Sequence, residues 1–141
     1  MALESIVNEI SLPHTPAQVW RALTDSAALA TWLMPNDFAP RVGHRFTFRT
    51  TPVPPYFDGT VHCEVIEVTP PARLAYTWVG GPQIDTVLTF TLRPQGAGTL
   101  LRLEHSGFDT STPAGRAAKA GLSRGWLALR LAERIAGVIA A

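Results

Sequence analysis

The sequence holds little cysteine and little charge, and both shortages narrow the class of protein. Its 141 residues contain one cysteine, Cys63, so no disulfide can form within the chain and a reducing, cytoplasmic setting is expected. Charged residues make up 16% of the sequence and the net charge is +1, which gives no strong field to attract nucleic acid. Hydrophobic residues reach 46%, which favours one compact domain over residues 1–141.

Several motifs that would indicate a function are also missing. No apolar run approaches the roughly 20 residues needed to cross a membrane, and no N-terminal stretch has the pattern of a signal peptide. The sequence lacks a phosphate-binding glycine loop, zinc-ligand spacing and a nucleophile elbow, so it predicts no cofactor and no metal ion. Basic residues do not alternate with aromatic ones as a nucleic-acid groove requires. These absences favour a binding protein over an enzyme.

The apolar pattern that is present predicts an α+β protein. A strand over residues 5–12 ends at Pro13, and short helices follow over residues 16–24 and 27–33, the first behind a capping box from Thr15 to Gln18. Alternation of apolar and polar residues then predicts strands over residues 45–49, 59–69, 74–78, 88–92 and 101–105. In the second of these strands the apolar parity changes between Val65 and Ile66, which indicates a bulge.

One long helix is predicted to close the chain, from Pro113 to about Ile139. One side of it carries small residues, which either allow close packing on the sheet or leave a cavity: Ala114, Ala118, Gly121, Gly125, Ala128 and Ala132. A narrow polar stripe comprises Arg116, Lys119, Ser123, Arg130 and Arg134. The remaining apolar face is too wide for a flat sheet, so either the sheet curls around the helix or the helix meets a partner subunit in a homodimer.

Fragments spread along the chain carry a family resemblance. They include residues 13–25, 67–74, 76–78, 105–108 and 125–126. In this order they resemble the START-like (SRPBCC) superfamily with the helix-grip fold, and within it the branch related to activators of the heat-shock protein 90 ATPase. The resemblance implies a curved antiparallel sheet wrapped around the C-terminal helix, with a cavity between them for small apolar molecules. Arg130 and Glu133 replace apolar residues of many relatives, and we expect them to pair on the surface.

The inward-facing residues form the predicted ligand-binding set, which is Trp32, Phe46, Phe48, Tyr76, Trp78, Phe90, Leu103, His105, Leu122, Trp126 and Leu129. The alternative is that these side chains are simply the core. The Tyr76 hydroxyl and the Trp78 indole N–H are the groups that could orient a ligand. The loop residues Phe38, Tyr56 and Phe57 are expected at the lip of the cavity, at an open sheet edge or at a dimer contact.

His105 is the strongest candidate for polar chemistry, because the alternation of its strand places its side chain on the inner face of the sheet. It could move a proton with Asn8, Tyr76 or Asp85 as partner, or be a core histidine bonded to a backbone carbonyl. His62 and Glu64 share one strand face and could act as acid and base or bind a metal, although a solvated face is favoured. Cys63 is predicted to be a small buried apolar residue and not a nucleophile.

Three functions are therefore compatible with the sequence. The favoured one is binding of a small hydrophobic molecule between sheet and helix, with no nucleic acid or membrane partner. The second is a polyketide cyclase- or dehydratase-like enzyme, in which His105 or Tyr76 would move protons in the same cavity. The third is a stress-related co-chaperone or interaction module, which would use the arginine stripe and the loop aromatics as its contact surface.

Overall fold

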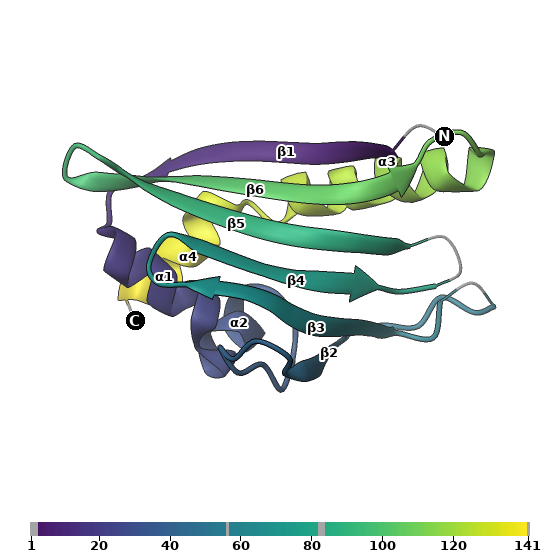
Figure 1. Cartoon of the computed structure of the whole chain (residues 1–141), viewed down its shortest axis with the longest axis horizontal. Helices are drawn as coiled ribbons and strands as arrows, with labels where there is room; N and C mark the ends of the chain where they lie inside the picture. The colour runs from purple at the N-terminus through teal and green to yellow at the C-terminus, as the bar shows by residue number, and fades with distance from the viewer. Residues whose placement is uncertain (1–2, 56, 82–83, 141) are drawn as a thin grey trace.

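A six-stranded antiparallel sheet carries all the helices on one of its faces (Figure 1). The computed structural model describes residues 3–55, 57–81 and 84–140. The strands lie in the order β1-β6-β5-β4-β3-β2. Their bounds are β1 Leu3–Leu12, β2 Arg45–Arg49, β3 Thr60–Thr69, β4 Arg73–Val79, β5 Asp85–Gln95 and β6 Gly98–Asp109. The predicted α+β helix-grip architecture is confirmed.

Two short helices connect β1 to β2 and are locked to each other. In α1 (Pro16–Thr24) the predicted capping box is present, with Gln18 N–H donating to Thr15 Oγ1 at 3.3 Å and Thr15 N–H to Gln18 Oε1 at 3.0 Å. At the start of α2 (Ser26–Trp32), Asp25 accepts from the Ala28 N–H. The Trp32 indole donates to the Ala22 carbonyl at 2.9 Å, so the two helices keep one mutual angle.

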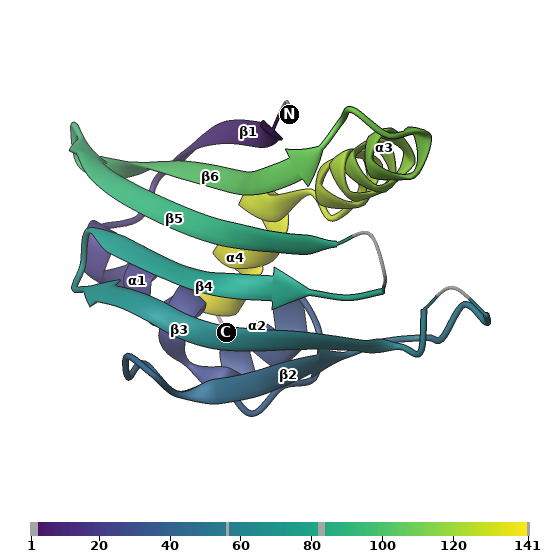
Figure 2. The same cartoon turned by 45° about the vertical axis from the view of Figure 1, so that its right-hand side comes forward.

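The predicted bulge in β3 is confirmed. The register between β3 and β4 shifts between Val65 and Glu67, so the inward parity of the strand changes at the point where the apolar pattern changes. A second bulge lies in β6, where Glu4 and Ser5 of β1 pair with Phe108 and Ser106 and leave Gly107, with a φ of 100°, as the extra residue. Bulges increase the local twist, and they contribute to the curvature that lets the sheet wrap the helices (Figure 2).

The single closing helix that the sequence predicts is instead two helices. The first, α3 (Pro113–Ala128), and the second, α4 (Leu131–Ala140), are separated by a break at which Arg130 has a φ of 53°. A positive φ is uncommon for a residue with a Cβ, so packing on both sides must hold Arg130 there. Arg130 and Glu133 form the expected surface pair, with Nη1 and Oε2 3.7 Å apart and both side chains exposed.

The break explains why the apolar face of the closing segment is so wide. After Arg130 the chain changes direction, and Leu131 and Ile135 become buried where α4 packs on α1, α2 and β1. Most of the apolar flank is therefore covered within the chain, whereas Leu127, just before the break, stays 68% exposed. One straight helix could not direct this flank and the small-residue side of α3 toward different neighbours.

Helix α3 is attached near its two ends and stands away from the sheet between them. Gly115 and Trp126 are the buried residues of α3. A Cβ at Gly115 would overlap the Asp109 carbonyl oxygen at the end of β6, so only glycine permits this approach. At Gly121 and Gly125, a Cβ would meet nothing within 4 Å. The small-residue side of α3 therefore leaves space in its middle and allows contact at its start.

A matched pair of glycine substitutions tests this attachment. We expect Gly115→Ala to lower the free energy of unfolding by about 1–3 kcal/mol, because the new methyl forces α3 away from β6. Gly121→Ala should raise it by about 0.5–1 kcal/mol, because alanine favours a helix and the site is open. Urea unfolding followed by circular dichroism measures both, and equal effects of the two variants would contradict the two-end attachment.

Candidate ligand-binding site

A cavity of about 720 Å³ lies between α3 and one end of the sheet. In Figure 2 the elements that border it are α3 at the upper right and the loops between β2 and β3 and between β4 and β5. Three alanines and a glycine of α3 form one wall, which leaves room because none has a side chain beyond Cβ. The full lining is Met34, Thr50, Val53, Phe57, Val61, Trp78, Gly80, Gly81, Ile84, Ala114, Ala117, Ala118, Gly121 and Leu122.

A smaller cavity of about 270 Å³ adjoins the large one further along α3. The two share Met34, Thr50, Trp78 and Leu122, and the smaller one adds Leu33, Gly125, Trp126 and Leu129. Together they follow α3 from its first turn to the break. Every shared residue except Thr50 is apolar or aromatic, so the junction is a predominantly apolar passage with one hydroxyl.

The predicted ligand-binding residues fall into two groups. Trp78, Leu122, Trp126 and Leu129 line the two cavities. The others are buried in the core and line neither cavity: Trp32, Phe46, Phe48, Tyr76, Phe90, Leu103 and His105. Strand parity, which selected the seven residues of the set that lie on strands, reports which face of the sheet is inside. It does not report which inward residues border free space.

The aromatic residues of the loops also fall into two groups, those that line the cavity and those that belong to the core. Phe57 lines the large cavity as expected of a lip residue. Phe38 is buried and packs edge-to-face on Phe46 with ring centroids 5.1 Å apart, so it belongs to the core. Tyr56 lies outside the described residues. Met34 and Ile84 line the cavity without having been predicted, because they lie in loops where no alternation shows which side chains turn inward.

Tyr76 is the centre of the aromatic core. Its ring contacts those of Phe46, Phe48 and Phe90 at centroid distances of 5.1, 6.0 and 6.4 Å. Burial, and secondarily the nearby Cys63, raise the pKa of Tyr76 well above its ordinary value. Its hydroxyl has no hydrogen-bond partner among the described residues. Tyr76 is thus a neutral core side chain, enclosed away from both cavities.

His105 is held by a continuous chain of hydrogen bonds. The Thr86 hydroxyl donates to the Trp78 carbonyl at 2.8 Å, so its oxygen is left to accept from His105 Nε2–H at 2.7 Å. His105 Nδ1 accepts from the Trp126 indole N–H at 3.0 Å. The pattern assigns one tautomer, the neutral ring protonated at Nε2. The chain links α3 through β6 and β5 to β4, directly beside the smaller cavity.

The partners of His105 differ from those expected. Thr86 and Trp126 bind it, in place of Asn8, Tyr76, Asp85 or a backbone carbonyl. Thr86 has the same parity as Leu88 and Phe90, so extending their alternation by one step would have identified it. Trp126 could not be placed beside His105 before the position of α3 was known. Burial lowers the pKa of His105 to about 3, so the ring is neutral at physiological pH.

The other candidate groups face solvent or lack activation. His62 is exposed, and Glu64 lies 3.4 Å from Arg45 in a surface ion pair. Within the described residues, no three His, Cys, Asp or Glu side chains gather where they could share a metal ion. Burial, together with the charge of Asp37, raises the pKa of the Cys63 thiol to about 12, which removes its nucleophilic form at neutral pH.

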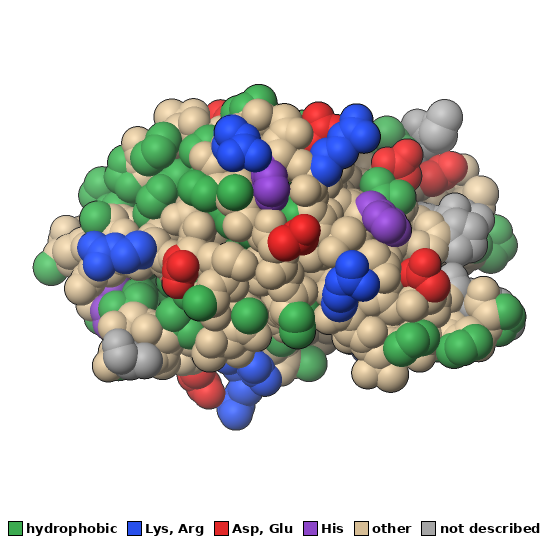
Figure 3. All heavy atoms as spheres, turned by 90° about the horizontal axis from the view of Figure 1, so that it is seen from below, with side chains coloured by type: hydrophobic (Ala, Val, Ile, Leu, Met, Phe, Trp, Pro, Cys, Tyr) green, Lys and Arg blue, Asp and Glu red, His purple; other side chains and the backbone are tan. Residues whose placement is uncertain are grey.

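The polar stripe of the closing segment is largely occupied by contacts within the chain. Lys119 pairs with Glu4 at 2.8 Å, and Arg116 donates to the Thr110 carbonyl. Figure 3 shows basic and acidic side chains interspersed over one face of the molecule, with no large patch of a single sign. In the described part of the chain, no helix has the length and apolar content that crossing a bilayer requires.

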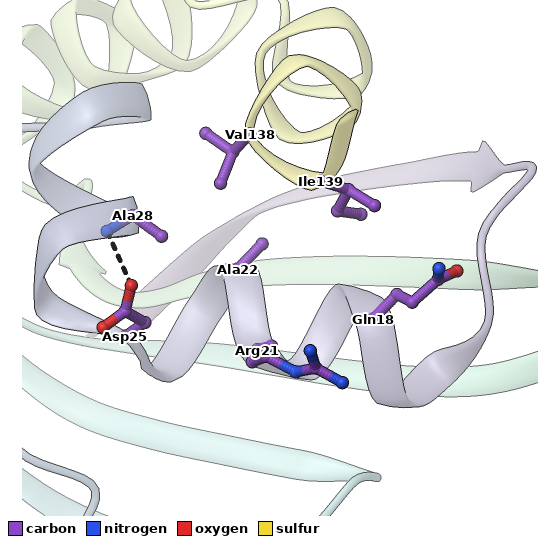
Figure 4. Close-up of a pocket in the computed structure, with 7 residues that line it drawn as sticks. All are labelled: Gln18, Arg21, Ala22, Asp25, Ala28, Val138 and Ile139. Atoms are coloured by element: carbon purple, nitrogen blue, oxygen red, sulfur yellow. Dashed lines mark hydrogen bonds between the residues drawn. The ribbon is translucent and has the colours of Figure 1, made fainter. Parts of the chain in front are cut away.

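A further depression of about 250 Å³ lies between α1, α2 and the end of α4 (Figure 4). Val138 and Ile139 of α4 point toward Ala22 of α1, while Gln18 and Arg21 lie along its rim. Its acidic group, Asp25, is already used to cap α2. The depression is a less suitable ligand site than the cavities along α3, because it is smaller than the large cavity and lined mainly by a seam between helices.

The curved sheet, the helix across it and the apolar cavity between them define a START-like helix-grip protein. Residues 13–134 match the family model of Activator of Hsp90 ATPase homolog 1-like protein, and the chain belongs to this family. No curated protein matches the sequence.

Solved structures show the same architecture. Protein MLL2253 from Mesorhizobium loti is 38% identical, with a TM-score of 0.83 over 96% of both chains. CalU16 from Micromonospora echinospora is 21% identical, with a TM-score of 0.74 over 99% of this chain and 87% of its own. The Aha1 dimer from Colwellia psychrerythraea is 21% identical, with a TM-score of 0.72 over 93% of both chains.

The depressed pKa of His105 predicts a loss of stability in mild acid. An unfolded histidine takes up its proton near pH 6.5, whereas folded His105 stays neutral down to about pH 3. The unfolded state then binds more protons, so the free energy of unfolding should fall by about 2 kcal/mol between pH 6.5 and 4.5. Urea unfolding at each pH, followed by tryptophan fluorescence, measures it.

The control for this prediction is His105→Gln, which removes the titrating ring. The pKa values of Glu4 and Asp109 are lowered by hydrogen bonds from Lys119 and Ser111 respectively, so these carboxylates remain ionised in the folded protein throughout that window. The variant should have a lower free energy of unfolding than the wild type at pH 6.5. Its free energy of unfolding should then fall less between pH 6.5 and 4.5. An equally steep loss in the variant would show that another group is responsible.

Proposed function

We propose that the protein binds a small hydrophobic molecule in the cavity between α3 and the sheet. The observation that carries this proposal is the apolar cavity of about 720 Å³ beneath a helix whose inner side is made of alanine and glycine. This volume lies within the range of roughly 300–1,000 Å³ that is usual for small-molecule sites. The fold shared with the family and with the Mesorhizobium loti protein supports the proposal, because a helix lying across a curved sheet leaves room for a cavity between them.

The arrangement of α3 also supports binding over simple core packing. Larger side chains on α3 would fill the space, and Gly121 and Gly125 have open room for a Cβ. Opposite α3, the Trp78 ring is held by contacts with Phe48 and with Trp126 of α3, at centroid distances of 5.4 and 5.6 Å. A preformed apolar space of this kind releases water when a ligand enters, and no large rearrangement is needed.

We favour binding over a polyketide cyclase- or dehydratase-like reaction. Both ring nitrogens of His105 are engaged, and its conjugate acid would have to give up the bond from Trp126. Tyr76 is enclosed in the core, and neither side chain lines the cavities. Proton transfer to a ligand requires contact with it, directly or through one water, and this geometry does not offer that contact.

A co-chaperone role is the function that the family description suggests by name. It receives less support from the surface, because Lys119, Arg116 and Arg130 of the polar stripe already contact groups of the same chain. A cytoplasmic setting remains our proposal for the location, supported by the buried free thiol of Cys63.

A space-filling substitution tests the proposed binding. We expect Ala118→Phe to weaken binding of the neutral fluorescent probe N-phenyl-1-naphthylamine at least tenfold, because the new ring occupies the cavity. Ala120→Phe is the matched control, since Ala120 is exposed on α3 and does not line the cavity. Fluorescence titration measures the dissociation constants. In the wild type, probe at 100 times its dissociation constant should add about 2.7 kcal/mol of stability.

Two results would contradict the proposal. One is a wild-type protein that neither binds the probe nor gains stability from it. The other is an Ala118→Phe variant that binds as tightly as the Ala120→Phe control, which would place the binding elsewhere.

We also propose that the chain forms a homodimer through β1. This strand is at one end of the sheet order, so its outer edge is free to pair with a second copy. Val7 of β1 and Leu127 of α3 are 45% and 68% exposed and line the same groove of about 360 Å³. The dimeric relative from Colwellia psychrerythraea lends support, since its fold is shared.

Leu127→Lys should abolish this association, because it places a charge in an apolar contact. Sedimentation of the wild type should give twice the chain mass of 15.2 kDa, and the variant should sediment at 15.2 kDa. Ile66→Lys is the control, since Ile66 is also an exposed apolar residue, 45% exposed, and lies on β3 far from β1 in the sheet order. A wild-type monomer, or equal effects of both variants, would contradict the proposed interface.

A further inference from the structure

We infer that the cavity selects an uncharged molecule carrying an oxygen acceptor, which the Trp78 indole N–H and the Thr50 hydroxyl bind where the two cavities meet. The inference rests on the proposed ligand binding and specifies the chemical class of ligand. A carbonyl or ether oxygen fits the acceptor, and an apolar ring system or chain fits the remainder.

The lining of the cavities argues against a charged ligand. Among the described residues that border either cavity, none is Asp, Glu, Lys, Arg or His. An ionised carboxylate or ammonium group would leave its hydration without meeting an opposite charge, which is strongly unfavourable. A neutral group loses far less hydration free energy on leaving water. The lack of charged residues in the lining therefore excludes charged ligands whatever their shape.

Trp78 provides the donor. Its side chain is almost fully buried, and among the described residues no acceptor pairs with its indole N–H. Among the described residues, Tyr76 Oη is fully enclosed without a hydrogen-bond partner. Trp78 Nε1 is not enclosed in this way. Because Trp78 borders both cavities, we expect its N–H to be reached from the place where they meet. An indole nitrogen can only donate, and the matching ligand atom must accept.

Thr50 is the second polar group at the same place. It borders both cavities together with Trp78, and its hydroxyl has no hydrogen-bond partner among the described residues. Its backbone is held, because the Thr50 N–H donates to the Gly59 carbonyl at 2.8 Å. Because both residues border both cavities, we expect one ligand oxygen to accept from the hydroxyl and from the indole, since an sp² oxygen has two lone pairs.

The residues further from the junction define the rest of the ligand. On the side of the large cavity they are Val61, Ile84, Ala118 and Gly121, which offer apolar surface without hydrogen-bonding side chains. The apolar body of the ligand fits there, and its oxygen points toward Trp78. The two polar groups thus set the orientation of the ligand, while the apolar walls supply most of the affinity.

Three matched compounds test this inference: 2-ethylnaphthalene, 2-acetylnaphthalene and 2-naphthoate. They share one ring system and differ in having no acceptor, a neutral carbonyl and a carboxylate. In Trp78→Phe and Thr50→Val, we expect the affinity for the ketone to fall about threefold to tenfold, the loss of one neutral hydrogen bond, while the affinity for the hydrocarbon changes less than twofold. At pH 7.4 the wild type should bind 2-naphthoate at least tenfold more weakly than the ketone.

The controls are Thr51→Val, beside Thr50 but outside both linings, and Trp20→Phe on α1. Circular dichroism checks that each variant is folded, and exposed Thr50 gives a variant that does not disturb the core. Equal losses for hydrocarbon and ketone, or naphthoate binding as tight as the ketone, would overturn this inference and leave the proposed function standing. Failure of the wild type to bind either neutral compound would overturn both.

Discussion

The attachment of α3 near its two ends is the constraint on which the rest of the structure depends. At the start of the helix, Gly115 lets its backbone approach the end of β6. Near its end, the Trp126 indole donates to His105, which Thr86 holds in one tautomer. These two contacts fix the height of the helix above the sheet, and the cavity is the space that the alanines and glycines between them leave unfilled. The buried histidine therefore helps to position the helix that forms one wall of the cavity.

The break at Arg130 gives the closing segment two separate tasks. Before the break, α3 presents small residues to an open space, and after it, α4 fills the end of the core with Leu131 and Ile135. A continuous helix would have turned the same large residues toward solvent or a partner. Placing an arginine at a positive φ is unfavourable for the backbone, and the burial of the two α4 side chains offsets it. Core and cavity thus lie side by side beneath one sheet.

Much of the fold could be predicted because it depends on patterns among residues close together in the sequence. Alternation over Leu74, Tyr76 and Trp78 indicated which face is inside, and the parity change at Val65 indicated the bulge. The cavity was predicted less well. Inward parity selects core residues such as Phe90 and cavity residues such as Trp78 equally, and the difference depends on whether another element covers the side chain. Phe57, a loop residue, lines the cavity as expected. Met34, Val53 and Ile84 also line it, but no sequence pattern could have predicted that.

The sequence by itself determined the α+β class, the strands and their inner face, the first two helices with their caps, and the small-residue side of α3. These depend on periodicity, on turn and cap chemistry and on side-chain size, all of which act over a few neighbouring residues. Only the tertiary structure decided where the closing segment breaks, that Trp126 and Thr86 satisfy His105, and which aromatic residues border open space. These depend on contacts between residues distant in the chain, whose distances follow from the packing of whole elements.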